Sequence, residues 1–249
     1  MAKRPPRELQ VIGSKRITLN MHRVTLGGPG MVDFPMDAAG GYIKLNFPPA
    51  EDGRPVTRTY SIRTQRDGEI DIDFVLHGDG GPASRWAVSC QPCETIMVGG
   101  PGPKTSVDHD ADWILMAGDM TALPAISVNI EELPADAAGC IAIEIIDEAD
   151  IQDLPIPAGF DVEWLVNPEP GEAPHLLADH VRNLSWRDGR PSVWVACEFN
   201  SMRTVRDYLQ KDRQLTKDEL YISSYWKHGA NEDSHRVAKR EDREALPVS

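Results

Sequence analysis

The amino-acid sequence predicts a two-part fold, in which a small antiparallel β-barrel is followed by a parallel α/β domain. The first hundred residues contain short β-like segments separated by Gly- and Pro-rich turn signals, a pattern typical of a closed barrel. From Trp113 onward, apolar segments alternate with amphipathic ones, which indicates a parallel sheet covered by helices. The mostly polar stretch 103–111 separates the two patterns, so we expect domains at 1–108 and 109–249.

Six segments of the first part have strand character. They are residues 9–12, 17–26, 42–47, 56–63, 69–76 and 95–98. Residues 65–68 join two of them and predict a hairpin. Residues 82–89 predict the one helix of this part, because Pro82 suits a first helical turn after two glycines.

The second part alternates strands with helices up to a charged tail. Strands are expected at 113–117, 140–146, 161–166, 192–197 and 219–223, and helices at 121–132, 173–184 and 200–211. The tail, residues 228–249, is highly charged and is either a solvated helix or a disordered end.

Composition narrows the class of protein. The chain has 249 residues, 41% of them hydrophobic and 26% charged, as expected of a folded soluble protein. A net charge of -13 argues against non-specific binding to nucleic acid, which needs a basic surface. No apolar run reaches the roughly 18 residues of a membrane span, and the start lacks the apolar core of a signal peptide. We therefore expect a cytoplasmic monomer without a stable membrane anchor.

The four cysteines give no metal signature. Cys90 and Cys93 form a C-x-x-C, whereas Cys140 and Cys197 stand alone in apolar runs and are expected to be small core residues. A redox-active pair is an alternative for the C-x-x-C, but Pro92 and the following strand favour an ordinary turn. A second pair or neighbouring histidines would be needed for zinc, so no metal is expected.

The segment 54–63 is unusual for a strand because it is dominated by Arg, Tyr and hydroxyl-bearing residues. One interpretation is a site for a flat aromatic cofactor with a phosphate tail. Tyr60 would pack on the ring system, and the planar fork of Arg58 or Arg63 would bind the phosphate. The alternative is an exposed edge strand with a solvated charged face.

Residues 77–84 form a Gly-rich loop that follows a strand and opens a helix. Free N–H groups of Ala83, Ser84 and Arg85 would then face outward at the positive end of the helix dipole, an arrangement that binds a pyrophosphate. A plain connection into a helix is the alternative.

Two segments of the second part leave the carboxyl ends of strands, where open α/β sheets bind their ligands. In residues 117–125, Gly118 provides a turn and Thr121 and Ala122 offer a hydroxyl and backbone N–H groups, while Asp119 is either a ligand or only a cap or turn residue. In residues 195–200, Glu198 either faces a nicotinamide or is a surface carboxylate. A barrel joined to such a domain suits a flavin with a nicotinamide donor.

Several motifs in order along the chain resemble the siderophore-interacting protein family, flavin-dependent ferric-siderophore reductases of the ferredoxin-reductase-like superfamily. The motifs are Arg58-Thr-Tyr-Ser-Ile-Arg63, residues 73–83 with Trp86-Ala87, Gly99-Gly-Pro-Gly102, residues 118–125, and Tyr225-Trp-Lys-His-Gly229 with the tail to Arg243. The resemblance implies a six-stranded antiparallel FAD-binding barrel followed by a parallel α/β nicotinamide-binding domain. Some ferric-siderophore reductases carry an iron–sulfur cluster on four carboxyl-terminal cysteines, which this chain lacks.

The resemblance also implies roles for individual residues. Those implied to bind FAD are Arg58, Tyr60, Ser61, Ile62, Arg63, Asp73, His77, Gly81, Pro82, Ala83, Ser84, Asp119, Thr121 and Ala122. Lys44 and Lys227 resemble positions where cations bind an anionic siderophore, although each could be an ordinary exposed lysine. Met120 stands where some relatives have a basic residue, and Trp226 is either a flavin neighbour or a core residue.

The electron donor is left open between NADH and NADPH, and some members of the family use ferredoxin. Asp147 follows the second strand of the α/β half, where an acid favours a free ribose hydroxyl and therefore NADH. Arg203 and Arg206 follow the Glu198 segment and could instead bind the 2′-phosphate of NADPH.

The expected activity is reduction of siderophore-bound iron(III) to iron(II) by FAD and NADH or NADPH. A flavin accepts a hydride and passes single electrons to iron, so no general base is needed, in agreement with the lack of a catalytic triad or carboxylate pair. The alternatives are a general flavin or ferric-chelate reductase, and a protein that holds FAD and binds the siderophore without turnover.

Overall fold

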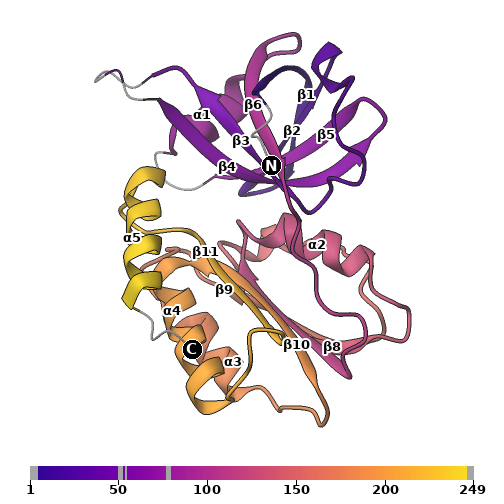
Figure 1. Ribbon diagram of the computed structural model, residues 1–249, viewed down its shortest axis with the longest axis vertical. Helices are drawn as coiled ribbons and strands as arrows, with labels where there is room; N and C mark the ends of the chain where they lie inside the picture. Colours follow the sequence, from indigo (N-terminus) through magenta and orange to yellow (C-terminus); the bar gives the residue numbers. More distant parts are fainter. Residues whose placement is uncertain (1–4, 50–52, 54, 77–79, 246–249) are drawn as a thin grey trace. The chain divides into compact units, whose positions relative to one another are not determined.

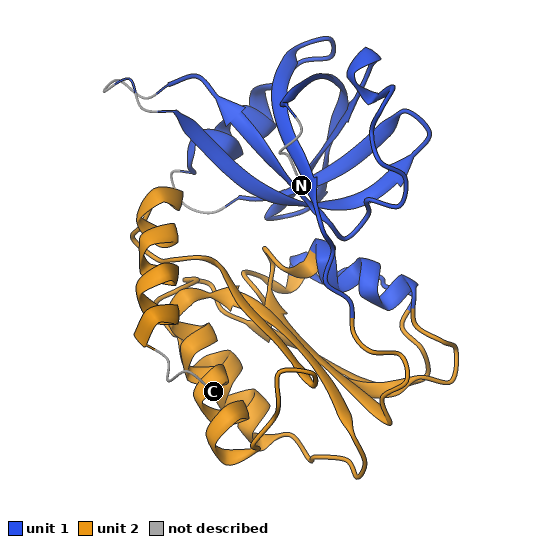
Figure 2. Ribbon diagram, in the orientation of Figure 1, with its two compact units in different colours: residues 1–106, 124–132, 149–155 blue, residues 107–123, 133–148, 156–249 orange. Residues whose placement is uncertain are grey.

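The computed structural model describes residues 5–49, 53, 55–76 and 80–245, and it confirms the predicted two-part fold. The chain forms two compact units (Figures 1 and 2). The barrel unit comprises residues 1–106, 124–132 and 149–155, and the α/β unit comprises residues 107–123, 133–148 and 156–249. The barrel unit therefore includes two short segments that come from later in the chain than the barrel strands themselves.

The barrel unit is built on six antiparallel strands that close in the order β1-β2-β5-β4-β3-β6. The strands are β1 (Arg7–Thr18), β2 (Met21–Gly27), β3 (Tyr42–Phe47), β4 (Val56–Arg66), β5 (Glu69–Val75) and β6 (Thr95–Gly102), with a short 3₁₀ turn at Pro29–Met31. Fully buried side chains such as Leu45, Ile62 and Phe74 fill its interior. Helix α1 (Pro82–Ser89) has the bounds that the sequence predicts.

The hairpin between β4 and β5 is also confirmed, with Arg66 opposite Glu69 across the turn. Gly68 takes a φ of 73° there, a left-handed conformation that glycine adopts without strain. The predicted single strand 17–26 is wrong, because the chain turns at Leu19 and Asn20 between β1 and β2.

A distant carboxylate stabilises the turn between β1 and β2. Asp150, which is fully buried, accepts hydrogen bonds from Thr18 Oγ1 at 2.7 Å, from the Asn20 backbone N–H at 2.7 Å and from Asn20 Nδ2 at 2.8 Å. Leu19 and Asn20 supply neither Gly nor Pro, so the local sequence carries no strong turn signal. The turn is therefore specified by a tertiary contact.

The α/β unit contains a five-stranded parallel sheet of order β11-β10-β7-β8-β9 (Figure 1). The strands are β7 (Trp113–Asp119), β8 (Ala138–Ile145), β9 (Gly159–Val166), β10 (Pro191–Glu198) and β11 (Leu220–Trp226). The central strands β7 and β10 are buried along their whole length, which explains their continuous apolar sequence. A 3₁₀ turn at Glu148–Asp150 follows β8.

Helices α3 (Leu176–Asn183) and α4 (Phe199–Asp207) belong wholly to the α/β unit. Helix α3 packs against β7 and β8, and α4, which continues into a π turn at Tyr208–Asp212, packs against β10 and β11. Helix α2 (Leu123–Glu131) falls almost entirely in the barrel unit, where Arg63 Nη2 donates to Glu131 Oε1 at 2.6 Å and Lys104 bonds Glu132 just after the helix.

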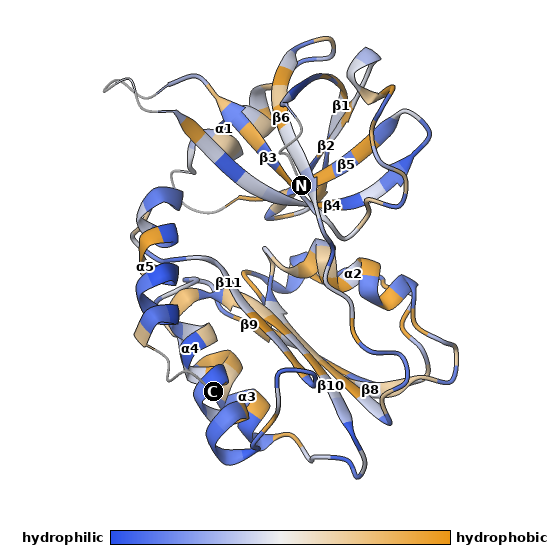
Figure 3. Ribbon diagram, viewed as in Figure 1, coloured by the Kyte–Doolittle hydropathy of each residue, from blue (hydrophilic) through white to orange (hydrophobic). Residues whose placement is uncertain are grey.

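The charged tail forms a helix, α5 (Glu232–Ala245), and thereby takes the first of its two predicted alternatives. The helix is strongly hydrophilic (Figure 3) and is attached to the α/β unit by polar groups. His235 Nε2 lies 2.8 Å from Ser224 Oγ, and Lys239 Nζ donates to the Ser224 carbonyl oxygen at 2.9 Å. Burial lowers the pKa of His235 to about 4, so the imidazole is neutral at physiological pH. Within the described part of the chain, no helix is both long and apolar enough to cross a membrane.

Candidate functional site

Strand β4 carries the predicted flavin residues on two opposite faces. Arg58, Tyr60 and the fully buried Ile62 are each two positions apart, so they share the face that turns toward the barrel core. Arg58 and Tyr60 are paired with the buried Leu45 and Ile43 of β3, which agrees with this orientation. The Tyr60 ring contacts Phe74, with the two centroids 4.4 Å apart. The structure therefore groups Arg58, Tyr60 and Ile62 and places Ser61 and Arg63 on the other face.

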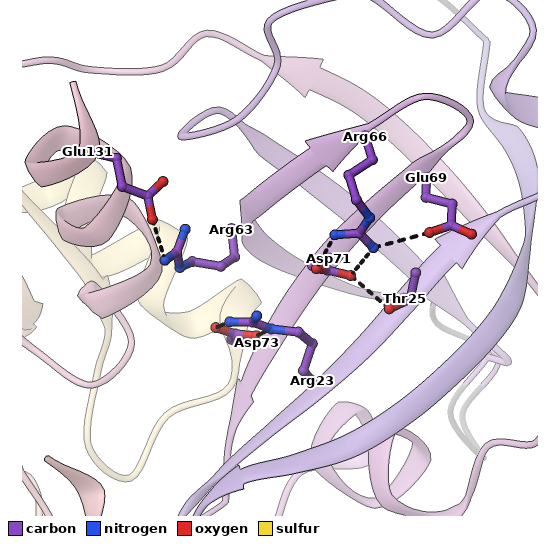
Figure 4. A network of polar contacts seen from close by, with 8 residues as sticks. All are labelled: Arg23, Thr25, Arg63, Arg66, Glu69, Asp71, Asp73 and Glu131. Carbon is purple, nitrogen blue, oxygen red and sulfur yellow. Dashed lines mark hydrogen bonds and ion pairs between the residues drawn. The ribbon is translucent and has the colours of Figure 1, made fainter. Parts of the chain in front are cut away.

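The two arginines of this strand differ in what they bind. Arg58 is half-buried, and its Nη1 donates to the carbonyl oxygen of Thr57 at 2.8 Å. Among the described residues, no carboxylate forms an ion pair with Arg58. Arg63 instead points toward Glu131 of α2 and donates to it at 2.6 Å (Figure 4). Arg58 is thus the arginine whose fork is available for a phosphate.

Asp73 is part of an ion-pair network on the outer side of the barrel (Figure 4). Its two carboxylate oxygens accept from Arg23 Nε at 2.5 Å and Arg23 Nη2 at 2.7 Å, and its side chain is only 3% exposed. Neighbouring Asp71 accepts from Arg66 and Thr25; burial alone would raise the pKa of Asp71, but these hydrogen bonds bring it below its usual value. The structure gives Asp73 a partner within the protein, which leaves its implied contact with FAD as an expectation.

The loop that opens α1 retains part of the predicted phosphate site. Gly81 is the N-cap in an extended conformation, and none of the described side chains caps the helix. A Cβ atom added to Gly81 would meet no atom of the described residues within 4 Å, so this part of the structure leaves room for a ligand at the backbone. His77 lies outside the described residues.

The first turn of α1 offers fewer groups than the sequence predicts. The Arg85 N–H is bonded to the Gly81 carbonyl oxygen at 3.1 Å, which leaves the N–H groups of Ala83 and Ser84 as candidates after Pro82. The Ser84 hydroxyl bonds back to the Val75 carbonyl oxygen at 3.2 Å. The helix can therefore contribute backbone donors, whereas the Ser84 side chain is engaged.

The carboxyl edge of the parallel sheet carries three buried acids, Asp119, Glu144 and Glu198, which are 7%, 8% and 3% exposed. They end or nearly end β7, β8 and β10, and Asp119 and Glu144 are register partners on adjacent strands. This edge is where α/β sheets bind ligands. The sequence predicted Asp119 and Glu198 here and missed Glu144, which stands within an apolar run.

Asp119 forms the predicted turn after β7. Its Oδ1 accepts from the Thr121 N–H at 2.9 Å and from Thr121 Oγ1 at 2.5 Å, and its Oδ2 accepts from Trp226 Nε1 at 2.8 Å. Burial raises the pKa of Asp119, and the hydrogen bonds from Thr121 and Trp226 oppose that rise. Ala122, fully buried, donates its N–H to the Asp119 carbonyl oxygen. The structure thus favours the turn interpretation of Asp119 and joins it to Trp226.

Glu198 is a helix cap. Its Oε2 accepts the N–H groups of Asn200 and Ser201 at the start of α4, and its Oε1 accepts the His228 N–H at 3.0 Å. Glu198 is buried, so the alternative of a surface carboxylate is wrong. Glu198 lies at the carboxyl edge of the sheet, as the sequence predicts. Both of its carboxylate oxygens, however, already accept hydrogen bonds from backbone N–H groups.

Glu144 is a buried acid without a cationic partner among the described residues. Its Oε1 accepts a hydrogen bond from Asn167 Nδ2 at 2.8 Å. Burial, followed by the proximity of Asp119, raises the pKa of Glu144 from 4.5 to about 7. The protonation of Glu144 is therefore sensitive to pH near neutrality.

Replacing Glu144 with glutamine is expected to stabilise the protein in a pH-dependent way. An acid whose pKa is raised on folding makes the folded state less stable as pH rises, here between about 4.5 and 7. Glutamine keeps the acceptor for Asn167 and removes the charge. Urea unfolding should show a gain that is about 2 to 3 kcal/mol larger at pH 8 than at pH 5. The exposed Glu148→Gln is the control, and equal gains at both pH values would contradict the prediction.

Of the residues proposed from the sequence for donor recognition, Asp147 and Arg203 are exposed, whereas Glu198 and Arg206 are buried. Asp147 lies two residues beyond the end of β8. Arg203 Nε is paired with Asp242 of α5 at 3.1 Å, and Asp242 also binds both terminal nitrogens of the largely buried Arg206. The two arginines are therefore held by one carboxylate.

The two predicted siderophore cations lie in different units. Lys44 is exposed on β3 of the barrel unit. Lys227 of the α/β unit is half-buried, and its Nζ lies 4.5 Å from the ring centroid of Phe199, a cation–π contact. Within the described residues, neither lysine has a carboxylate at salt-bridge distance. Met120 is buried in the α/β unit, which fits a core residue.

The barrel unit offers hydrogen-bond donors that suit the diphosphate of FAD. Arg58 offers a guanidinium without a carboxylate partner in the described chain, and α1 offers uncapped N–H groups beside an open glycine backbone. These groups suit a diphosphate. Tyr60 adds an aromatic ring on the same face as Arg58.

Comparisons with known proteins agree with this geometry. Residues 48–105 match the family model of the siderophore-interacting FAD-binding domain, and residues 111–229 match that of the siderophore-interacting protein. The chain is 35% identical to the ferric vibriobactin reductase ViuB of Vibrio cholerae, over 92% of each chain. It is 30% identical to an NADPH-dependent ferric-chelate reductase of Escherichia coli, over 88% of this chain and 92% of the relative.

The chain is also similar to a solved structure over nearly its whole length. The siderophore-interacting protein SipS from Aeromonas hydrophila superposes with a TM-score of 0.85 at 33% identity, covering 97% of this chain and 99% of that one. The match to an FAD-binding domain supports FAD as the cofactor. The sequence identity, the family models and the fold agree, and the chain belongs to the siderophore-interacting protein family.

Proposed function

We propose that this protein is an FAD-dependent NAD(P)H:ferric-siderophore oxidoreductase that reduces siderophore-bound iron(III) and so releases iron(II) in the cytoplasm. Family membership and reductase relatives support an oxidoreductase acting on ferric chelates. The observation that carries the proposal is Arg58 together with the open start of α1, within the segment that matches the FAD-binding domain.

In this proposal the barrel domain, residues 1–108, holds FAD. Arg58 and the N–H groups of Ala83 and Ser84 bind its phosphates, Tyr60 packs on a ring, and Ser61, Ile62 and Arg63 complete the strand's contribution. Bound FAD supplies the conversion between the two electrons of a nicotinamide and the single electron that iron(III) accepts. The protein residues bind and orient the reactants, and none is required as a general base.

The α/β domain, residues 109–249, binds the donor at the carboxyl edge of its sheet. Asp147 accepts a ribose hydroxyl, and this acid favours NADH. The engagement of Arg203 and Arg206 by Asp242 supports the same choice, because a 2′-phosphate would have to displace that carboxylate. Lys44 and Lys227 attract the anionic ferric siderophore to an otherwise acidic monomer of net charge -13.

The test is spectroscopic. The purified protein should show the two absorption bands of oxidised flavin, lose them anaerobically on addition of NADH, and regain them with a ferric siderophore while a chelator traps iron(II). Faster bleaching by NADPH than by NADH would overturn the donor assignment. Bleaching without reoxidation by ferric siderophore would contradict the enzymatic proposal and leave a protein that binds without turnover.

A general ferric-chelate reductase is the second candidate, favoured by the relative that carries that name. The two candidates differ in selectivity. Equal rates of flavin reoxidation with ferric citrate and with ferric siderophores would support the second candidate, whereas a clear preference for siderophores supports the first.

A further inference from the structure

The segment that follows the last sheet strand is held by two buried carboxylates. Trp226 ends β11, and its indole Nε1 donates to Asp119 Oδ2 at 2.8 Å. Two residues later, the His228 N–H donates to Glu198 Oε1 at 3.0 Å. Lys227, the residue between these two contacts, is therefore fixed from both sides within the α/β unit.

Each of the two acids binds a second part of the unit with its other oxygen. Asp119 Oδ1 accepts from the Thr121 N–H and hydroxyl, and Glu198 Oε2 accepts from the first turn of α4. Neither acid forms an ion pair with any described residue, so all of these donors are neutral groups. Both carboxylates act as rigid bridges between the ends of neighbouring strands and residues 226–228.

The two bridges determine where the Lys227 ammonium lies. Its Nζ is 4.5 Å from the centroid of Phe199, the residue directly after Glu198, and no described carboxylate neutralises it. On a chain with net charge -13, Lys227 is thus a half-buried positive charge that no described carboxylate neutralises, and such a charge attracts anionic ligands. A cation held in one place binds an anion with less loss of side-chain and backbone freedom than a mobile one.

We propose that Asp119 and Glu198 are positioning residues, which hold residues 226–228 so that Lys227 is presented to the anionic groups of the ferric siderophore. The inference rests on the proposed function for the identity of the anion. It assigns to Asp119 and Glu198 a role in substrate affinity that is exerted through Trp226, His228 and Lys227.

The first experiment tests the bridges without using activity. Asp119→Asn keeps one oxygen for Thr121 and turns an NH2 group toward the Trp226 indole N–H, so the bond is lost. In the FAD-loaded protein, trypsin should then cut after Lys227 about tenfold faster, the factor expected for loss of one hydrogen bond to a charged group. Cleavage after the exposed Lys211 should not change, and Asp110→Asn, at an exposed site, is the matched control.

Trp226→Phe removes the indole N–H and keeps an aromatic ring, so it should accelerate the same cleavage to a similar extent. The double variant should be no faster than either single variant, because both lose the same bond. Additive effects, or unchanged cleavage after Lys227 in Asp119→Asn, would overturn the bridge.

The second experiment tests the role in affinity. With FAD content measured for each variant, Asp119→Asn and Glu198→Gln should raise the KM for an anionic ferric siderophore about five- to tenfold. The KM for an uncharged ferric chelate should stay within about twofold, a selectivity that mere loss of structure does not produce. Lys227→Ala should raise the same KM, and adding Asp119→Asn to it should have little further effect.

A rise in KM that is equal for charged and uncharged chelates would overturn the inference, as would a normal KM in Lys227→Ala. If the wild-type protein reduces no ferric siderophore, the proposed function fails, and the proteolysis result still decides independently whether the two carboxylates hold residues 226–228.

Discussion

Replacing Arg58 with alanine is expected to release FAD from the protein. A guanidinium that binds a phosphate through two charge-assisted hydrogen bonds contributes about 3 kcal/mol, which corresponds to a loss of about 100-fold in affinity. Arg58 suits this role because, among the described residues, its fork is engaged by the Thr57 carbonyl oxygen and by no carboxylate. Gel filtration followed by the ratio of flavin to protein absorbance gives the retained FAD, and titration of the apoprotein gives the dissociation constant.

Two further variants separate charge and geometry. Arg58→Lys keeps the charge without the planar fork and should bind FAD with intermediate affinity. Arg63→Ala serves as the matched comparison on the same strand, and its loss of affinity should be smaller, under about tenfold, since Arg63 already binds Glu131. Full retention of FAD by Arg58→Ala would show that the phosphates are held elsewhere, and a larger loss in Arg63→Ala would reverse the assignment of the two arginines.

Local sequence signals were sufficient for most elements of the fold. The start of α1 follows from Pro82 in its first turn, after two glycines. The apolar runs of β7 and β10 predict central strands of a parallel sheet, and their order in the sheet follows the usual crossover pattern. Regular elements are predictable where periodicity and terminal residues agree.

The missed features depend on contacts between distant residues. The turn at Leu19 and Asn20 has only a weak local signal, and Asp150, far away in the sequence, accepts the hydrogen bonds that stabilise it. Likewise, the apolar run around Glu144 predicts a buried strand, but only the register of β7 and β8 shows that this acid lies beside Asp119. Sequence reasoning could have singled out Glu144 as a carboxylate near the end of an otherwise apolar strand.

The candidate site was predictable as a set of positions rather than as a set of contacts. Glu198 and Asp119 stand at the carboxyl ends of strands, as expected, but the structure binds both to neighbouring N–H groups. Similarly, the alternation of β4 separates Arg58 from Arg63, and partner choice then distinguishes them. Which oxygen or guanidinium remains available depends on tertiary neighbours that a linear motif does not specify.

Removing Arg23 is expected to destabilise the barrel strongly. Both oxygens of the buried Asp73 accept from this arginine, and the two residues are direct partners across β2 and β5 (Figure 4). Arg23→Ala leaves a carboxylate that is only 3% exposed without its counter-charge, which typically costs about 3 to 5 kcal/mol. For a domain that is marginally stable, such a loss is a large part of the total free energy of unfolding. Urea unfolding at neutral pH measures it.

The reason for the loss can be tested by removing both charges together. Arg23→Ala combined with Asp73→Ala eliminates the buried carboxylate, so the double variant should be more stable than Arg23→Ala alone by at least about 1 kcal/mol. Lys15→Ala is the control, because Lys15 is exposed and lies directly opposite Arg23 on β1, and it should change stability by less than about 0.5 kcal/mol. A double variant that is less stable than Arg23→Ala would mean that Asp73 stabilises the barrel independently of Arg23. In that case Asp73 must stabilise the barrel through another contact, such as the contact with FAD that the family resemblance implies.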